Sequence, residues 1–217
     1  MHRPLENAGR RHRSISIDVD TLVRHQRRHD DHRDLVTGTR LSSVRQYTGR
    51  IINLDVDTVR FPDGSVGELE MIRHPGASVV LPFLSDPAGE DPQVLLIRQY
   101  RYAAESYIYE IPAGRLEPGE SPEACARREL LEEAGCTAER IEHVYTFYTT
   151  PGFTDEKIHA FMATGLTRGD ARPEADEFVE AVPVTMSKAL AMIRDAEIVD
   201  GKTVVTLLYV AGFRLGR

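Results

Sequence analysis

The segment that most constrains this chain is the 23 residues from Gly114 to Cys136, GRLEPGESPEACARRELLEEAGC. It contains the signals that begin and end a single helix. Ser121 can cap the helix N-terminus, and Pro122 suits the first helical position. Gly135 can adopt the left-handed conformation that ends a helix. The segment therefore predicts a helix that begins after Ser121 and ends at Gly135.

Helical spacing gathers three carboxylates on one side of this predicted helix. Glu129, Glu132 and Glu133 fall together, and the apolar residues fall on the other side: Ala124, Leu130, Leu131 and Ala134. Carboxylates this close repel each other unless a cation neutralises them, and a hard divalent cation with oxygen ligands does so well. Taken alone, such a cluster is more typical of a solvated acidic helix face than of a metal site.

The full spacing of the segment resembles the Nudix box, G-x5-E-x7-R-E-U-x-E-E-x-G-U, at every fixed position. Cys136 stands where an aliphatic residue is usual, and a buried thiol behaves as a small hydrophobic residue. The resemblance implies the Nudix fold, an α/β (α+β) architecture in which helices sandwich a mixed β-sheet. It also implies that Arg128 and Glu120 orient the box through an ion pair.

Four further segments resemble the ADP-ribose pyrophosphatase subfamily of Nudix hydrolases. Their order and spacing around an intact box carry the resemblance, because each segment alone is a weak signal. They are His74–Ala77, Ile97–Tyr102, Glu110–Gly114 and Pro151–Glu156. The resemblance spans roughly residues 45–214. It implies hydrolysis of ADP-ribose to AMP and ribose 5-phosphate with Mg²⁺, or Mn²⁺ as the alternative metal.

The same resemblance assigns the metal ligands. Glu129 and Glu133 are the expected carboxylate ligands, and the backbone carbonyl of Ala113 completes the set. Glu132 is expected to act as a further catalytic carboxylate beside them. A divalent cation held there would neutralise the diphosphate and lower the pKa of the attacking water.

Two arginines and a loop glutamate are the expected substrate contacts. Arg101, with Arg98 second, could bind the diphosphate because guanidinium forks match phosphate oxygens. Glu156 resembles a contact on the nucleoside side. The resemblance also implies a general base on a loop after the box, and the candidates before the last strand are Glu177 and then Glu180. These two residues lie three apart and should point to opposite faces of the strand, so only one can face the metal ligands.

Two other functions stay open at this point. Another nucleoside diphosphate sugar, such as GDP-mannose, could be the substrate, because the segment from Glu110 to Gly114 does not distinguish between them. A Nudix module that binds a nucleotide without cleaving it is the alternative outside enzymes. Such modules commonly lose glutamates of the box, and this chain keeps them.

Composition bounds the remaining classes. The 217 residues carry a net charge of −7, which argues against a general nucleic-acid-binding protein. No apolar run approaches the roughly 20 residues that span a bilayer, and the N-terminus lacks the apolar core of a signal peptide. Cys125 and Cys136 lie about 16 Å apart along the predicted helix, too far for a disulfide. We therefore expect a cytoplasmic protein without membrane partners.

The chain divides into three expected parts. Residues 1–43 are basic and poor in large apolar residues, and they predict a poorly ordered extension. Residues 44–75 predict a β-hairpin, with a turn at 62–65, that cannot bury its own apolar face. In the resembled subfamily such strands exchange between two subunits, so we expect a homodimer. Residues 76–217 form the expected Nudix domain, ending in helices near 186–195 and 201–213.

Overall fold

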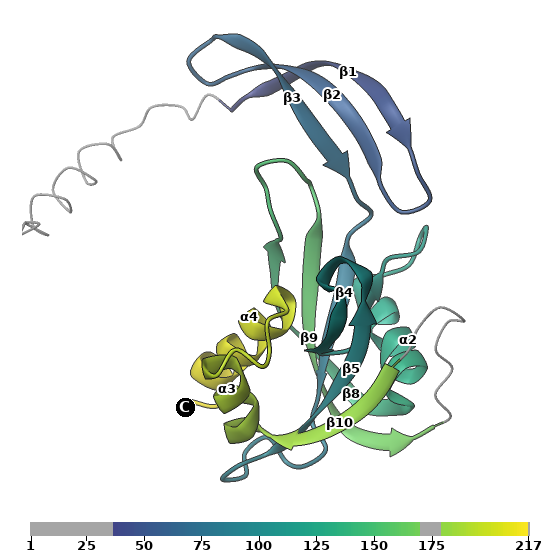
Figure 1. Cartoon of the computed structure of the whole chain (residues 1–217), viewed down its shortest axis with the longest axis vertical. Coiled ribbons are helices and arrows are strands. Elements are labelled where there is room, and N and C mark those ends of the chain that lie inside the picture. The colour runs from purple at the N-terminus through teal and green to yellow at the C-terminus, as the bar shows by residue number, and fades with distance from the viewer. Residues whose placement is uncertain (1–36, 170–178, 217) are drawn as a thin grey trace, which may run out of the picture.

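The computed structural model describes residues 37–169 and 179–216. Most of the basic extension expected over residues 1–43 lies outside the described residues, and so does Glu177. The described part consists of a body of strands and helices, with a smaller sheet above it (Figure 1).

The body contains two sheets. The larger one has four strands in the order β7-β4-β9-β8, formed by Ala113–Arg115, Ala77–Pro82, Lys157–Arg168 and Cys136–Tyr148. β4 pairs parallel with β9 and antiparallel with β7, so the sheet is mixed, as the sequence predicts. The smaller sheet has the order β10-β5-β6, formed by Val179–Thr185, Gln93–Arg101 and Ser106–Glu110. A 3-10 turn at Tyr102–Ala104 joins β5 to β6.

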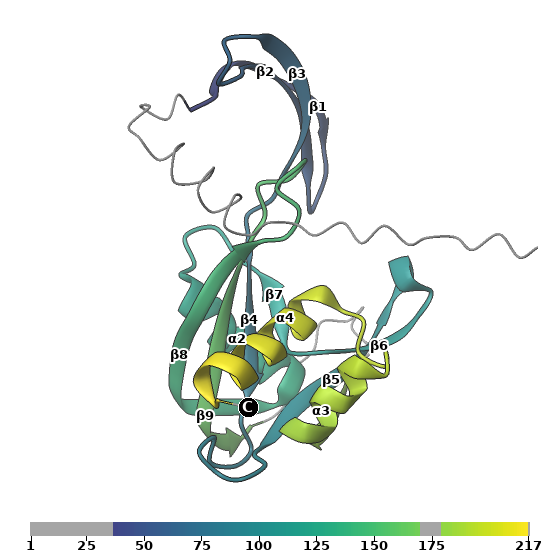
Figure 2. The ribbon, with the colours of Figure 1, turned by 90° about the vertical axis from the view of Figure 1, so that its left-hand side faces the viewer.

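Helices cover both faces of these strands (Figure 1, Figure 2). α2 (Pro122–Ala134) packs on one face against β4 and β8. α3 (Met186–Arg194) and α4 (Gly201–Tyr209) cover the other face, and a π-helical segment, Val210–Arg214, follows α4. The expected α/β/α sandwich is confirmed. No helix in the described ranges is long and apolar enough to cross a membrane.

Alternation along β4 divides the core between the two helical layers. Val79 and Leu81 belong to the cluster that contains Leu207 of α4, whereas Val80 packs with Leu130 of α2. Successive side chains of a strand point to opposite faces, so one strand serves both layers. All five side chains are fully buried. Burial of a side chain of this size stabilises the fold by roughly 1.5–3 kcal/mol.

β1 (Thr39–Thr48), β2 (Asn53–Arg60) and β3 (Val66–Arg73) form a separate antiparallel sheet, here called the N-terminal sheet. The sequence predicts only the β2–β3 hairpin and ordered structure from residue 44, so β1 is a correction. Its sequence lacks a regular apolar alternation, and the strand is exposed along its whole length. Pairing with β2, rather than burial of an apolar face, makes this segment a strand.

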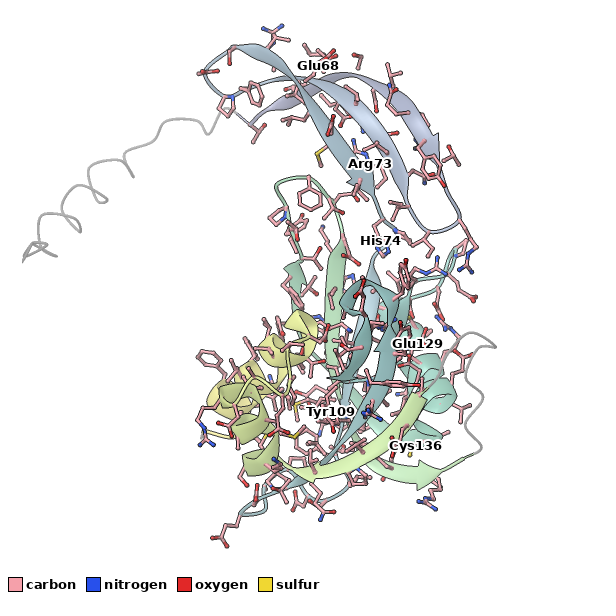
Figure 3. The ribbon with its side chains drawn as sticks, viewed as in Figure 1. Glu68, Arg73, His74, Tyr109, Glu129 and Cys136 are labelled. Atoms are coloured by element: carbon pink, nitrogen blue, oxygen red, sulfur yellow. The ribbon has the colours of Figure 1, made fainter. Side chains whose placement is uncertain are left out.

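The N-terminal sheet joins the body at the end of β3. The N–H of Ile72 donates to the carbonyl of Phe153 at 2.7 Å, and the N–H of Asp155 donates to the carbonyl of Ile72 at 3.3 Å. Arg73 lies 3.4 Å from the carboxylate of Asp155 and also pairs with Asp57 of β2. Figure 3 shows Arg73 and the neighbouring His74 between the upper sheet and the body. This narrow junction places the N-terminal sheet above the body.

The start and end predicted for α2 are confirmed. The side chain of Ser121 accepts from the N–H of Ala124, and Gly135 has a φ of 59° in the left-handed region. The predicted division of the helix faces is wrong in part, because Ala124 is exposed whereas Glu129 and Glu133 are buried. Tertiary packing, which spacing alone does not report, turns these two carboxylates toward β7.

The cysteines also differ from the prediction in their placement. Cys125 lies on α2, but Cys136 is the first residue of β8 and not part of the helix. Both thiols are buried and free, as expected. Burial raises the pKa of the Cys125 thiol to about 11. A thiol in this state is a poor nucleophile.

Candidate active site

A cavity of about 600 Å³ opens beside α2 and β7, and we call it the site cavity. It brings together residues from seven separate parts of the chain, between Ile51 and Lys202. Those singled out from the sequence are Arg101, Ala113, Glu129, Glu132 and Glu156. His74 and Lys202 line it as well, although the sequence analysis assigns them no role. Figure 3 shows Glu129 on α2, below His74.

The backbone of β7 and the carboxylates of α2 fit closely together. Glu129 and Glu133 are 6% and 4% exposed. The N–H of Ala113 donates to Oε2 of Glu133 at 2.8 Å. A Cβ atom added at Gly114 would lie 1.6 Å from Oε1 of Glu129. The missing side chain of this glycine lets the carboxylate approach the strand, and a Cβ atom here would displace Glu129.

Arg128 organises the acidic face of α2. Its guanidinium donates to both carboxylate oxygens of Glu120, at 3.0 and 3.1 Å, which is the ion pair expected from the sequence. It also donates to Glu129 and, at 3.0 Å, to Glu132. The hydrogen bonds from Arg128 hold the pKa of Glu120 below its usual range. One arginine thus partly neutralises three carboxylates.

The donors at this face are of the kind that suits a hard divalent cation: carboxylates and a backbone carbonyl. Within residues 37–169 and 179–216, however, no three His, Cys, Asp or Glu side chains are gathered in an arrangement that could hold a metal ion. Arg128 contacts both Glu129 and Glu132, so a cation would compete with its guanidinium for these oxygens. The oxygen atoms of these residues are thus of the kind that binds a divalent metal. In this conformation, Arg128 provides the positive charge that partly neutralises the carboxylates.

A second charged cluster forms the other wall of the site cavity. Arg101 donates through Nε and Nη2 to the two oxygens of Glu110, at 2.6 and 2.8 Å. Lys202 contacts the same carboxylate and lies 2.9 Å from Asp200. Burial alone would raise the pKa of Glu110, but Arg101 and Lys202 outweigh it and hold that pKa below its usual range.

Sequence reasoning misses Lys202 and the role of Glu110. Glu110 lies 92 residues before Lys202, and no local pattern reports such a contact. One signal is available, because Lys202 falls in the first turn of a helix capped by Asp200. The positive end of a helix dipole disfavours a cation, so a lysine in this position indicates a specific partner.

Three of the described residues that the sequence predicts do not line the site cavity: Glu133, which contacts Ala113 from behind it, Arg98 and Glu180. Arg98 and Arg101 are three residues apart on β5 and so point to opposite faces. The guanidinium of Arg98 lies 4.5 Å from the ring centroid of Tyr107. Glu180 lies on β10, where its carboxylate is 3.6 Å from Arg98 and 69% exposed. Neither Arg98 nor Glu180 is among the residues that line the cavity.

Glu156 lies at the edge nearest the N-terminal sheet. Its carboxylate accepts from the hydroxyl of Thr149 at 2.9 Å and lies 3.3 Å from Nδ1 of His74. His74 directly follows β3 and lines the same cavity. The N-terminal sheet is thereby connected to the candidate substrate contacts.

Comparisons with known proteins agree with this architecture. The NUDIX domain family matches residues 73–204. A methanol dehydrogenase activator from Bacillus methanolicus is 40% identical over 165 residues, 75% of this chain and 86% of that protein. An ADP-ribose pyrophosphatase from Bacillus subtilis is 39% identical over 165 residues, with the same coverage of 75% and 86%.

A solved structure, that of an ADP compounds hydrolase, shares the fold with a TM-score of 0.72 at 22% identity. The alignment covers 85% of this chain and 98% of that one. The family match spans more than half of the chain and includes α2, β7 and all the residues that line the site cavity except Ile51. This chain belongs to the Nudix family.

Proposed function

We propose that this chain hydrolyses the diphosphate bond of ADP-ribose to give AMP and ribose 5-phosphate, with Mg²⁺ as the metal and Mn²⁺ as the alternative. The observation that carries the proposal is the site cavity, where Arg101, Glu129, Glu132 and Glu156 meet beside Ala113. The ADP-ribose pyrophosphatase that is 39% identical supports an ADP-linked substrate.

Arg101 is the group that receives the diphosphate. Glu110 fixes its guanidinium through Nε and Nη2, which leaves its other edge for a phosphate oxygen. The side chain of Arg101 remains 41% exposed although its partner Glu110 is 1% exposed. A guanidinium held on a buried carboxylate loses little freedom when the substrate binds, and this favours binding.

Glu129, Glu133 and the carbonyl of Ala113 would hold the metal, with Glu132 as a further carboxylate beside them. A hard divalent cation, when bound, supplies charge neutralisation and a lower pKa for the attacking water. Without the metal, Arg128 holds these carboxylates close together. When Glu129 and Glu132 bind the metal, Arg128 would still have Glu120 as its partner.

The base that takes the proton of the attacking water is assigned to Glu177. Its position just before β10 follows from the sequence, and it lies outside the described residues. Glu180 is the second candidate, but its carboxylate is near Arg98 and exposed to solvent.

The N-terminal sheet is proposed as the dimerisation element and the body as the catalytic domain. β1 is exposed throughout and carries the apolar residues Leu41, Val44 and Tyr47, which are 48%, 58% and 59% exposed. A second subunit that covers this surface should bury well over about 1,000 Å². The free cysteines support a cytoplasmic location.

The experiment that tests the function is a panel of nucleoside diphosphate compounds incubated with Mg²⁺, with the products separated by chromatography. We expect ADP-ribose to give AMP and ribose 5-phosphate in equal amounts and at the highest kcat/KM. A higher kcat/KM for GDP-mannose would replace ADP-ribose by the alternative substrate. Binding without turnover of any compound would indicate a nucleotide-binding module and refute the proposal.

A further inference from the structure

Lys202 occupies a position where a lysine is normally unfavourable. It lies in the first turn of α4, near the positive end of the helix dipole, and its side chain is only 15% exposed. An ammonium group is strongly hydrated, and burial removes much of that water. The carboxylates of Asp200 and Glu110 compensate for this loss. A cation that needs two acids to hold it on the wall of a cavity is a candidate for ligand binding.

Glu110 connects Lys202 to Arg101. Its side chain is 1% exposed, and one carboxylate oxygen contacts both the ammonium of Lys202 and the guanidinium of Arg101. Removing either cation would leave a buried carboxylate less well compensated, which is costly. Glu110 therefore fixes the two cations with respect to each other on one wall of the site cavity.

The start of α4 is hydrogen-bonded to Ile111, which lies between β6 and β7. The N–H of Ile111 donates to Oγ1 of Thr203 at 2.9 Å, and this hydroxyl donates to Asp200 at 2.6 Å. Thr203 is fully buried. Ile111 lies two residues before Ala113, the expected metal carbonyl. Hydrogen bonds through Asp200, Thr203 and Ile111 thus link Lys202 to the segment that leads into β7.

We propose that Lys202 binds a phosphate oxygen of the substrate diphosphate together with Arg101, and that Glu110 is the positioning residue that holds both cations. This assignment rests on the proposed diphosphate hydrolysis. An ammonium donates three hydrogen bonds, and within the described part of the chain Glu110 and Asp200 take two of them. The third is available to an anion in the site cavity.

Variants of Lys202 test the assignment. Lys202→Met removes the charge at similar length, and Lys202→Arg keeps it. Lys188→Met is the matched control, because Lys188 is 54% exposed on α3 and pairs with Glu197 at 3.5 Å. Calorimetry would measure the affinity of each variant for the methylene-bridged analogue of ADP-ribose and for adenosine, an uncharged probe. Unfolding temperatures would be recorded for the same proteins.

Lys202→Met should weaken binding of the analogue at least about tenfold, as expected for a lost charge-assisted hydrogen bond, and raise KM by a similar factor. Adenosine affinity should not change. Lys202→Arg should retain most of the analogue affinity, and Lys188→Met all of it. Glu110→Gln should also raise KM more than it lowers kcat, because it releases both cations.

A purely structural Lys202 would give a different result. Lys202→Met would then lower the unfolding temperature but bind the analogue normally. This result would overturn the phosphate-binding role of Lys202 and leave the proposed hydrolysis unaffected. If Lys202→Met does not fold, Lys202→Gln, which keeps a donor for Asp200, takes its place with the same expected loss. A wild-type chain that cleaves no diphosphate compound would instead refute the proposed function, and the assignment with it.

Discussion

The junction of α2 and β7 and the N-terminal sheet differ in how much of their structure the chain completes by itself. At the junction, Glu129 and Glu133 are buried against the backbone of Ala113 and Gly114. In the N-terminal sheet, the whole of β1 is exposed. The first region has its contacts within one chain, whereas the second presents exposed apolar side chains, which we propose a second subunit covers. Chemistry is therefore expected at the first region and assembly at the second.

The largest expected effect is a loss of kcat when the proposed general base is removed, and it tests whether chemistry takes place in the body. Glu177→Gln should lower kcat by roughly 10²–10⁴ and keep KM within severalfold, because a general base acts after binding. Steady-state kinetics with ADP-ribose measures both constants. Glu180→Gln is the matched variant and should remain close to wild type. A near-normal kcat for Glu177→Gln, with a collapse for Glu180→Gln, would transfer the role to Glu180.

A change at Gly114 tests the close fit between β7 and α2. Gly114→Ala introduces a Cβ atom 1.6 Å from the present position of Glu129 Oε1, so the carboxylate must move. We expect kcat/KM to fall by up to about a hundredfold and the free energy of unfolding by roughly 1–3 kcal/mol. Gly152→Ala is the control, because no atom lies within 4 Å of its added Cβ. If the two variants have the same kcat/KM and the same free energy of unfolding, the close fit of Gly114 against Glu129 does not contribute to activity or stability.

A charge on β1 tests the second half of the comparison. Val44→Lys places an ammonium in the proposed interface, where it should weaken dimerisation roughly tenfold or more. Light scattering at micromolar concentration would then give a mass closer to the 24.4 kDa of one chain. Val199→Lys is the control, since Val199 is 60% exposed in the body. A wild-type chain that is monomeric and fully active would rule out the dimer proposal.

The smallest expected effect concerns acid stability at the Glu110 cluster. The folded state holds the pKa of Glu110 below its ordinary value of 4.5, so the folded protein binds this proton more weakly than the unfolded chain. The stabilisation is present above that value and is lost as the pH falls through the depressed pKa. Between pH 7 and pH 3, the unfolding temperature of Glu110→Gln should therefore fall less than that of the wild type, by roughly 2–4 °C. Parallel melting curves would contradict this.

The same two regions explain what the sequence predicts and what it misses. The limits of α2 follow from Ser121, Pro122 and Gly135, because caps act on backbone groups of the same turn. The pair Arg128–Glu120 follows from the resemblance to the Nudix box. β1 is not predicted, because this strand forms by pairing with β2 and its own sequence has no regular alternation of apolar and polar residues. The place of Lys202 at the site is not predicted either, because its partner Glu110 is distant in sequence.

The central claim is that the α2 carboxylates hold a divalent metal that this chain needs to cleave ADP-ribose. Its most direct test is the turnover of ADP-ribose by the wild type and Glu133→Gln, measured before chelation, after thorough chelation and after Mg²⁺ is restored. Wild-type turnover should disappear with chelation and return with Mg²⁺, while Glu133→Gln should fold normally and be at least about a hundredfold slower than the wild type whenever Mg²⁺ is present. Wild-type turnover that survives chelation, or a Glu133→Gln variant with normal kcat, would contradict the account.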